Sequence, residues 1–108
     1  IIGQNPKDAG AYANIAYAYE KLGQWARAAA NYRASLELNR DNGEIRYRLA
    51  RVLEKTGSEK EALALYESVH KDMPENPAVL NALADGYLKA GQYEKAIPFY
   101  REVIAREP

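Results

Sequence analysis

With 108 residues, the chain has the length of a single domain. Its fifteen basic and fifteen acidic side chains cancel, which argues against nucleic-acid or membrane-surface binding, since both functions need a basic excess. The absence of cysteine excludes disulfides and thiolate metal or redox sites, and it leaves the compartment unknown, either cytoplasmic or periplasmic.

The sequence repeats itself with a period of 34 residues. The anchors of this period are Ala16, Ala50 and Ala84; Gly23, Gly57 and Gly91; Ala28, Ala62 and Ala96; and Tyr32, Tyr66 and Tyr100. A fixed period of this length is typical of stacked helical repeats. It divides the chain into repeat 1 (residues 9–42), repeat 2 (43–76) and repeat 3 (77–108), with positions counted from Ala9, Gly43 and Pro77.

Residues 1–8 stand in register with the end of a repeat, because Pro6 aligns with Pro74 and Pro108. We therefore expect this segment to be the C-terminal tail of a preceding repeat. On this interpretation the chain is a fragment of a longer array.

Each repeat is predicted to begin with a helix preceded by a residue whose side-chain oxygen caps the first turn. The caps are Asp8, Asn42 and Asn76, and the first helices are expected over about residues 10–22, 44–56 and 78–90. The glycine that follows each helix can adopt the left-handed conformation that ends it. Second helices are expected over about residues 25–38, 59–72 and 93–106, and Ser58 with Glu61 fits a capping box.

The recurring residues resemble the tetratricopeptide repeat pattern. In repeat 3 they are Leu80, Leu83, Ala84, Tyr87, Ala96, Tyr100 and Pro108. The chain is therefore similar to the tetratricopeptide repeat (TPR) family over residues 9–108. The resemblance implies an all-α fold of antiparallel helix pairs, stacked as a right-handed superhelix whose first helices line the concave side.

The resemblance also implies a non-enzymatic protein-protein interaction module, which binds a peptide or protein segment in its concave groove as part of a larger scaffold. The alternative is a regulatory or substrate-presenting domain of a multidomain enzyme whose catalytic part lies elsewhere. We expect no catalytic residue, cofactor or metal in this fragment, because His70 is the only histidine and no glycine-rich phosphate loop occurs.

The candidate binding residues lie on the exposed side of the first helices, where stacking aligns equivalent positions in columns. They are Tyr17, Tyr47, Arg48, Arg51, Lys55, Asn81 and Asp85. Arginines beside tyrosines favour a carboxylate-bearing peptide, because arginine can hold a carboxylate with two bonds. The opposing interpretation is solvated surface, with Glu44 pairing with Arg48 and Asp85 with Lys89 along their helices.

Four further side chains are given structural interpretations. His70 is expected to be partly buried with a local hydrogen-bond partner, and Trp25 is expected to be a packing residue. Ile97 and Ile104 are expected on the outward side of the last helix, where they would favour weak self-association through the open ends of the array.

Overall fold

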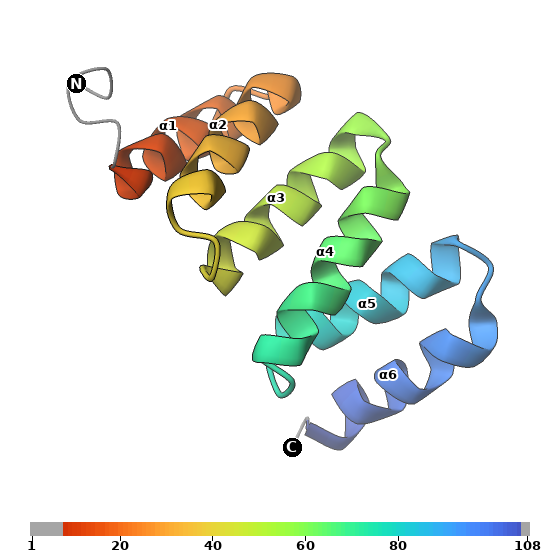
Figure 1. The fold of residues 1–108 in the computed structure, drawn as a ribbon. Coiled ribbons are helices and arrows are strands. Elements are labelled where there is room, and N and C mark those ends of the chain that lie inside the picture. The colour runs from red at the N-terminus through yellow and green to blue at the C-terminus, as the bar shows by residue number, and fades with distance from the viewer. Residues whose placement is uncertain (1–7, 107–108) are drawn as a thin grey trace.

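The computed structural model describes residues 8–106, which form six α-helices and contain no strand (Figure 1). The helices are α1 (Ala9–Lys21), α2 (Trp25–Leu38), α3 (Gly43–Thr56), α4 (Glu59–Asp72), α5 (Pro77–Lys89) and α6 (Tyr93–Arg106). Apart from Asp8, the expected tail of a preceding repeat at residues 1–8 lies outside the described residues.

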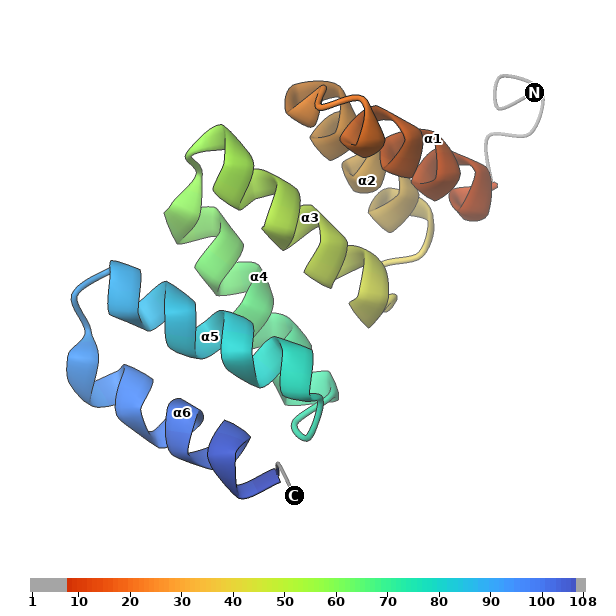
Figure 2. The ribbon, with the colours of Figure 1, turned by 180° about the vertical axis from the view of Figure 1, so that it is seen from behind.

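The helices form three antiparallel pairs that are stacked along one axis (Figures 1 and 2). The second helices α2 and α4 each pack on their own first helix and also on the first helix of the next repeat, whereas α6 packs on α5. The molecule measures 48 × 24 × 22 Å, as expected for a stack rather than a sphere. These features confirm the predicted all-α repeat architecture.

The predicted caps and turns are present. The side chains of Asp8, Asn42 and Asn76 each accept a hydrogen bond from a backbone N–H of the following turn, at 2.8 to 3.3 Å. The first helices end at glycines with positive φ angles, which are +74° at Gly23, +87° at Gly57 and +78° at Gly91. Only glycine adopts this conformation at low steric cost, so these residues fix where each pair of helices reverses direction.

The predicted capping box at the start of α4 is wrong. The Ser58 side chain makes no cap hydrogen bond, and its hydroxyl lies 3.5 Å from that of Thr56. The Glu61 carboxylate accepts two bonds from Arg33 of repeat 1 instead. A paired, charge-assisted contact is stronger than a neutral capping bond, which explains why Glu61 turns away from the helix terminus.

Alanines form the seam between the two helices of every repeat. They occupy positions 8 and 20, and none is more than 1% exposed: Ala16, Ala28, Ala50, Ala62, Ala84 and Ala96. Their short side chains let the paired helices approach closely. This close approach directs the larger apolar side chains outward toward the neighbouring repeat.

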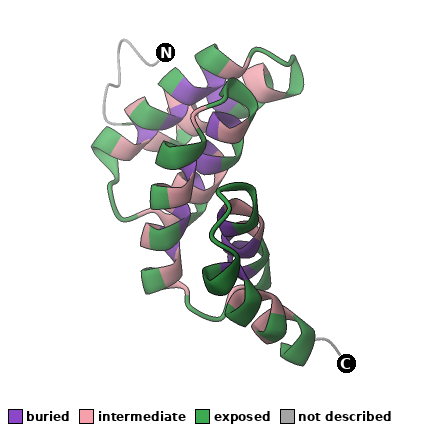
Figure 3. Cartoon of the chain, turned by 90° about the vertical axis from the view of Figure 1, so that its right-hand side faces the viewer, coloured by how far each residue is buried: buried purple, intermediate pink, exposed green. Residues whose placement is uncertain are grey.

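The tyrosines at position 24 anchor the core from the second helix. Tyr32 and Tyr66 are fully buried, whereas Tyr100 in α6 is half-buried. No described helix follows α6, and Figure 3 shows this helix mostly in the colours of exposed and intermediate residues. Burial at this position therefore depends on the following repeat as well as on the residue's own partner helix.

Side-chain size alternates across the two joints between repeats. In the second joint, a Cβ added to Gly86 would lie only 2.8 Å from a methyl carbon of Leu63. The equivalent positions of the first joint hold Ala29 and Val52, which are both buried. At these equivalent positions the large and the small residue therefore stand in opposite order at the two joints, which keeps their combined volume similar.

The substitution Tyr66→Ala should lower the free energy of unfolding by about 3–5 kcal/mol, because it removes a buried aromatic ring from the middle repeat. Tyr100→Ala is the matched control and should cost less, since its ring is only half-buried. Urea unfolding followed by circular dichroism measures both. Equal losses would show that the two tyrosines contribute the same burial and that the core has been misplaced.

The substitution Gly86→Val should destabilise the protein by about 1–3 kcal/mol, because the new side chain overlaps Leu63. Adding Leu63→Ala reproduces the small–large order of the first joint and should recover part of the loss. A double-mutant cycle in urea measures this coupling, which should be on the order of 1 kcal/mol. Strictly additive effects would show that the two positions do not share one packing volume.

Candidate functional site

The structure brings Tyr17 of α1 together with Arg48 of α3. The Arg48 guanidinium carbon lies 5.4 Å from the centre of the Tyr17 ring, and the Lys21 ammonium lies 5.1 Å from the same centre. These separations are typical of cation–π contacts. Tyr17 is 44% exposed, so its ring remains available on the exposed side of α1, α3 and α5, here called the first-helix face.

A notch of about 290 Å³ lies between α1 and α3 on the first-helix face. It is lined by Ala13, Asn14, Tyr17, Tyr32, Glu44, Ile45 and Arg48. The lining combines aromatic and aliphatic surface with one cation and one carboxylate. A space of this size fits one side chain or a chain terminus, which suits peptide recognition better than the binding of a large cofactor.

Arg51 lies beside Tyr47, one turn farther along α3. Its guanidinium carbon is 6.0 Å from the centre of the Tyr47 ring. Tyr47 is itself held against the buried Tyr66, with 5.7 Å between ring centres and an angle of 55° between the rings. The core therefore fixes the aromatic surface on which this arginine rests.

The cations of the first-helix face differ in whether a carboxylate already neutralises them. Arg48 pairs with Glu44 at 3.3 Å, which is the contact expected from their spacing along α3. Arg51 and Lys55 form no ion pair with any residue from 8 to 106, although the Lys55 ammonium lies 5.8 Å from the Trp25 ring centre. The uncompensated positive charge of α3 therefore lies at its C-terminal half.

The two candidate residues on α5 behave differently from those on α3. Asn81 is exposed, whereas the Asp85 carboxylate accepts a hydrogen bond from Tyr100 of α6. The expected pairing of Asp85 with Lys89 is wrong, because Lys89 lies 4.0 Å from Glu54 of the preceding repeat. The sequence pattern placed Asp85 on the exposed side of its helix. Because its carboxylate accepts this bond from Tyr100, Asp85 is less free to contact a ligand than that placement suggested.

Hydrogen bonds from tyrosine hydroxyls to carboxylates of the first helix are the main polar feature that the sequence analysis missed. Tyr32 donates to Glu20 at 2.7 Å and Tyr66 donates to Glu54 at 2.9 Å, each from position 24 to position 12. Repeat 3 has Leu88 at position 12, which explains why Tyr100 turns to Asp85 at position 9. The sequence did contain a signal for these bonds, because glutamate recurs at position 12 of repeats 1 and 2.

Burial and these carboxylates keep the tyrosines protonated. Burial is the first cause that raises the pKa of Tyr32 and of Tyr66 above the usual value, and the neighbouring glutamate adds to it. The bond to Asp85 raises the pKa of Tyr100 to about 12, with a further contribution from burial. All three hydroxyls therefore act as hydrogen-bond donors at physiological pH.

The remaining candidates have structural roles. Trp25 is partly buried and packs on the core. His70 is partly buried as expected, but its Nδ1 atom is buried without a hydrogen-bond partner among the described residues, so the expected local partner is wrong. Its ring packs edge-on against Phe99, with 5.3 Å between centres, and this aromatic contact takes the place of a polar one.

Other possible sites on residues 8–106 offer little chemistry. No group of three or more metal-ligating side chains is found in this range, and none of its helices is long and apolar enough to cross a bilayer. A cavity of about 700 Å³ lies near the helix turns of repeats 2 and 3 and is not lined by Arg48 or Arg51. The arginine–tyrosine cluster on the first-helix face is therefore the strongest candidate for recognition.

Comparison with solved structures shows the same fold in MamA. One MamA crystal structure superposes with a TM-score of 0.90 at 17% identity, covering 96% of this chain and 61% of that one. A MamA RS-1 ArsTM double mutant gives 0.89 at 24% identity, covering 96% and 58%. A further MamA mutant gives 0.84 at 21% identity, covering 94% and 74%. At such identities the likeness establishes the fold alone.

Among curated proteins, the chain is 29% identical over 112 residues to the protein CTR9 homolog of Arabidopsis thaliana. The match covers all of this chain but only 10% of that protein. The chain therefore spans about a tenth of the length of this relative.

A family model described as the tetratricopeptide repeat matches residues 21–84 and again residues 57–108, which together cover most of the chain. Proteins of this kind typically serve as interaction modules that bind other proteins, and the stacked helix pairs described above are the arrangement expected for them. The periodic sequence, the six-helix solenoid and this match agree, and the chain belongs to the tetratricopeptide repeat family.

Proposed function

We propose that the chain is a non-enzymatic module that binds a peptide or protein segment bearing a carboxylate across its first-helix face. The observation that carries this proposal is the position of Arg51, a cation without an ion pair among the described residues and supported by the ring of Tyr47. An arginine held over an aromatic surface is already partly ordered, so less side-chain entropy is lost when it binds an anion.

Arg51 is the preferred anchor for the carboxylate, and Arg48 plays a secondary role. A ligand that binds Arg48 must compete with Glu44, which lies 3.3 Å from its guanidinium nitrogen. That pair is solvent-exposed and therefore weak, so a ligand can displace it at small cost. Arg51 needs no such displacement, and Lys55 one turn further along α3 adds to the attraction of negative charge.

Tyr17 and the notch beside it supply the apolar part of the recognition. A ligand side chain entering the notch would contact the Tyr17 ring and the wall formed by Ala13 and Ile45. Asn81 and Asp85 of α5 extend the same face and would offer polar contacts farther along the peptide, although Asp85 must share its carboxylate with Tyr100. We propose that an extended segment crosses the helices in this way.

The open geometry predicts modest affinity. The notch is shallow and the cations are partly solvated, so we expect a dissociation constant in roughly the micromolar range. The affinity should decrease as added salt screens the charges. Because the chain corresponds to about a tenth of its curated relative, we also propose that it acts as one part of a larger scaffold or assembly protein.

A library of acidic and C-terminally free peptides, screened against the wild-type protein and then measured by fluorescence anisotropy, tests the proposal. Arg51→Glu should weaken the best binders by about tenfold or more, and Arg48→Glu should weaken them less, because Arg51, unlike Arg48, has no carboxylate partner among the described residues. The variant with both substitutions should lose nearly all binding.

Arg40→Glu is the matched control, since it makes the same charge change at an exposed residue in the turn between α2 and α3. It should bind the peptides almost as the wild type does. Tyr17→Ala tests the apolar contact and should reduce affinity without changing the melting temperature. Equal binding by the wild type and the double Arg48→Glu, Arg51→Glu variant would overturn the proposal and place recognition on another surface.

A further inference from the structure

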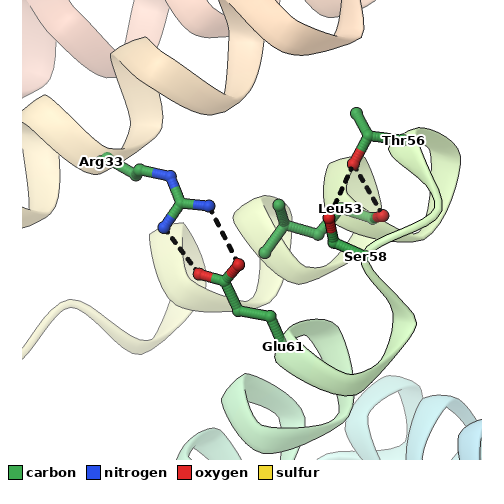
Figure 4. A network of polar contacts seen from close by, with 5 residues as sticks. All are labelled: Arg33, Leu53, Thr56, Ser58 and Glu61. Carbon is green, nitrogen blue, oxygen red and sulfur yellow. Dashed lines mark hydrogen bonds and ion pairs between the residues drawn. The ribbon is translucent and has the colours of Figure 1, made fainter.

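A pair of opposite charges connects the second helices of repeats 1 and 2. The Arg33 guanidinium of α2 donates two hydrogen bonds to the Glu61 carboxylate of α4, at 2.6 and 3.1 Å. Figure 4 shows the two side chains reaching toward each other from their two helices. In repeat numbering, position 25 of one repeat meets position 19 of the next.

The joint between repeats 2 and 3 has opposite charges at the same two positions, but with the signs reversed. Position 25 is now Glu67 and position 19 is Lys95. Both reach the same ring, since the Tyr87 hydroxyl donates to the Glu67 carboxylate and the Lys95 ammonium lies 5.6 Å from the Tyr87 ring centre. Both described joints thus place one acid and one base at positions 25 and 19.

The outward face of α6 presents the same surface that α2 and α4 use within the array. Its apolar part is exposed, with Ile97 at 48% and Ile104 at 68%, and no described helix covers it. Ile97 is equivalent to Leu63, whose neighbour across the joint is a glycine. Position 25 on this face is the exposed Arg101, which is equivalent to Arg33.

We propose that the face of α6 formed by Ile97, Arg101 and Ile104 is a docking surface for a helical hairpin of this repeat type that carries a carboxylate at the position of Glu61. Two features support this occupant. The face continues the packing surface of the two described joints, and its cation matches the one that Glu61 neutralises in the first joint. A small residue opposite Ile97, as Gly86 is opposite Leu63, completes the fit.

A second copy of this chain meets the size requirement of the surface but not its charge requirement. Stacked in register, α6 of one copy would meet the first repeat of the next, where Ala18 is the small residue facing Ile97. The same register places Arg101 against Arg27, which lies 5.8 Å from the Tyr19 ring centre just as Lys95 lies near Tyr87. Repulsion between the two arginines therefore opposes the end-to-end self-association expected from the exposed isoleucines alone.

Charge reversal separates these two requirements. The probe is this chain with Arg27→Glu, which presents a glutamate at the position of Glu61 beside the small Ala18. Sedimentation velocity should show that this variant associates head to tail about tenfold more strongly than the wild type, because attraction replaces repulsion. Arg101→Glu should strengthen association similarly, since it would place a carboxylate at position 25 and Arg27 at position 19, the same order of charges as Glu67 and Lys95 in the second joint.

The variant with both substitutions places two glutamates at the joint and should return to the weak association of the wild type. Its net charge differs from that of the single variants, so Arg27→Glu combined with Arg40→Glu is the matched control. This control has the same net charge but keeps the complementary pair, and it should associate more strongly than the double reversal. Added salt should reduce all these differences.

The apolar part of the surface is tested by adding Ile97→Asp to the Arg27→Glu variant, with circular dichroism to confirm the fold. Association should be lost, because the joint would bury an unpaired carboxylate. The proposal is overturned if the single reversals associate no better than the wild type, if the double reversal associates as strongly as they do, or if Ile97→Asp leaves association intact.

Discussion

The close approach of the two helices within each repeat is the constraint on which the rest of the structure depends. Alanines at positions 8 and 20 allow it, and all six are at most 1% exposed. Once the pair is fixed, position 24 points its tyrosine into the core, and the opposite side of the first helix carries Tyr17, Arg48 and Arg51 to the exposed face. The arrangement of side chains on the first-helix face is thus a product of the packing behind it, as the contact between Tyr47 and Tyr66 shows.

Most of the fold could be predicted from the sequence, because the features that determine it are local and periodic. Helix caps such as Asn42 and helix-ending glycines such as Gly57 act within a few residues of their own position. In the structure they lie at the positions that the 34-residue period predicts. The capping box at Ser58 failed for the opposite reason. Its glutamate had a stronger partner in Arg33, 28 residues away in the chain, and no local pattern reveals such a competitor.

The candidate site was predictable as a face but not as a set of contacts. Helical periodicity brought the tyrosines and arginines of α1 and α3 to one side, and the contact between Tyr17 and Arg48 follows from stacking. Within residues 8–106, Arg48 is paired and Arg51 is not, and this difference depends on rotamers that spacing alone leaves open. Asp85 accepts the hydrogen bond from Tyr100 because repeat 3 lacks the glutamate that accepts it in repeats 1 and 2.

Because side-chain size and charge alternate across the two joints, the order of the repeats matters, although all three repeats form the same pair of helices. An evolutionary deletion of repeat 2 would keep the 34-residue period and the complete helix pairs of repeats 1 and 3, yet it would bring Ala29 opposite Gly86 and Arg33 opposite Lys95. Ala29 and Gly86 together would leave a cavity at the joint, and the two cations Arg33 and Lys95 would repel each other. Loss or shuffling of whole units, a common route of change in repeat proteins, is therefore restricted here by side chains that no single repeat could reveal.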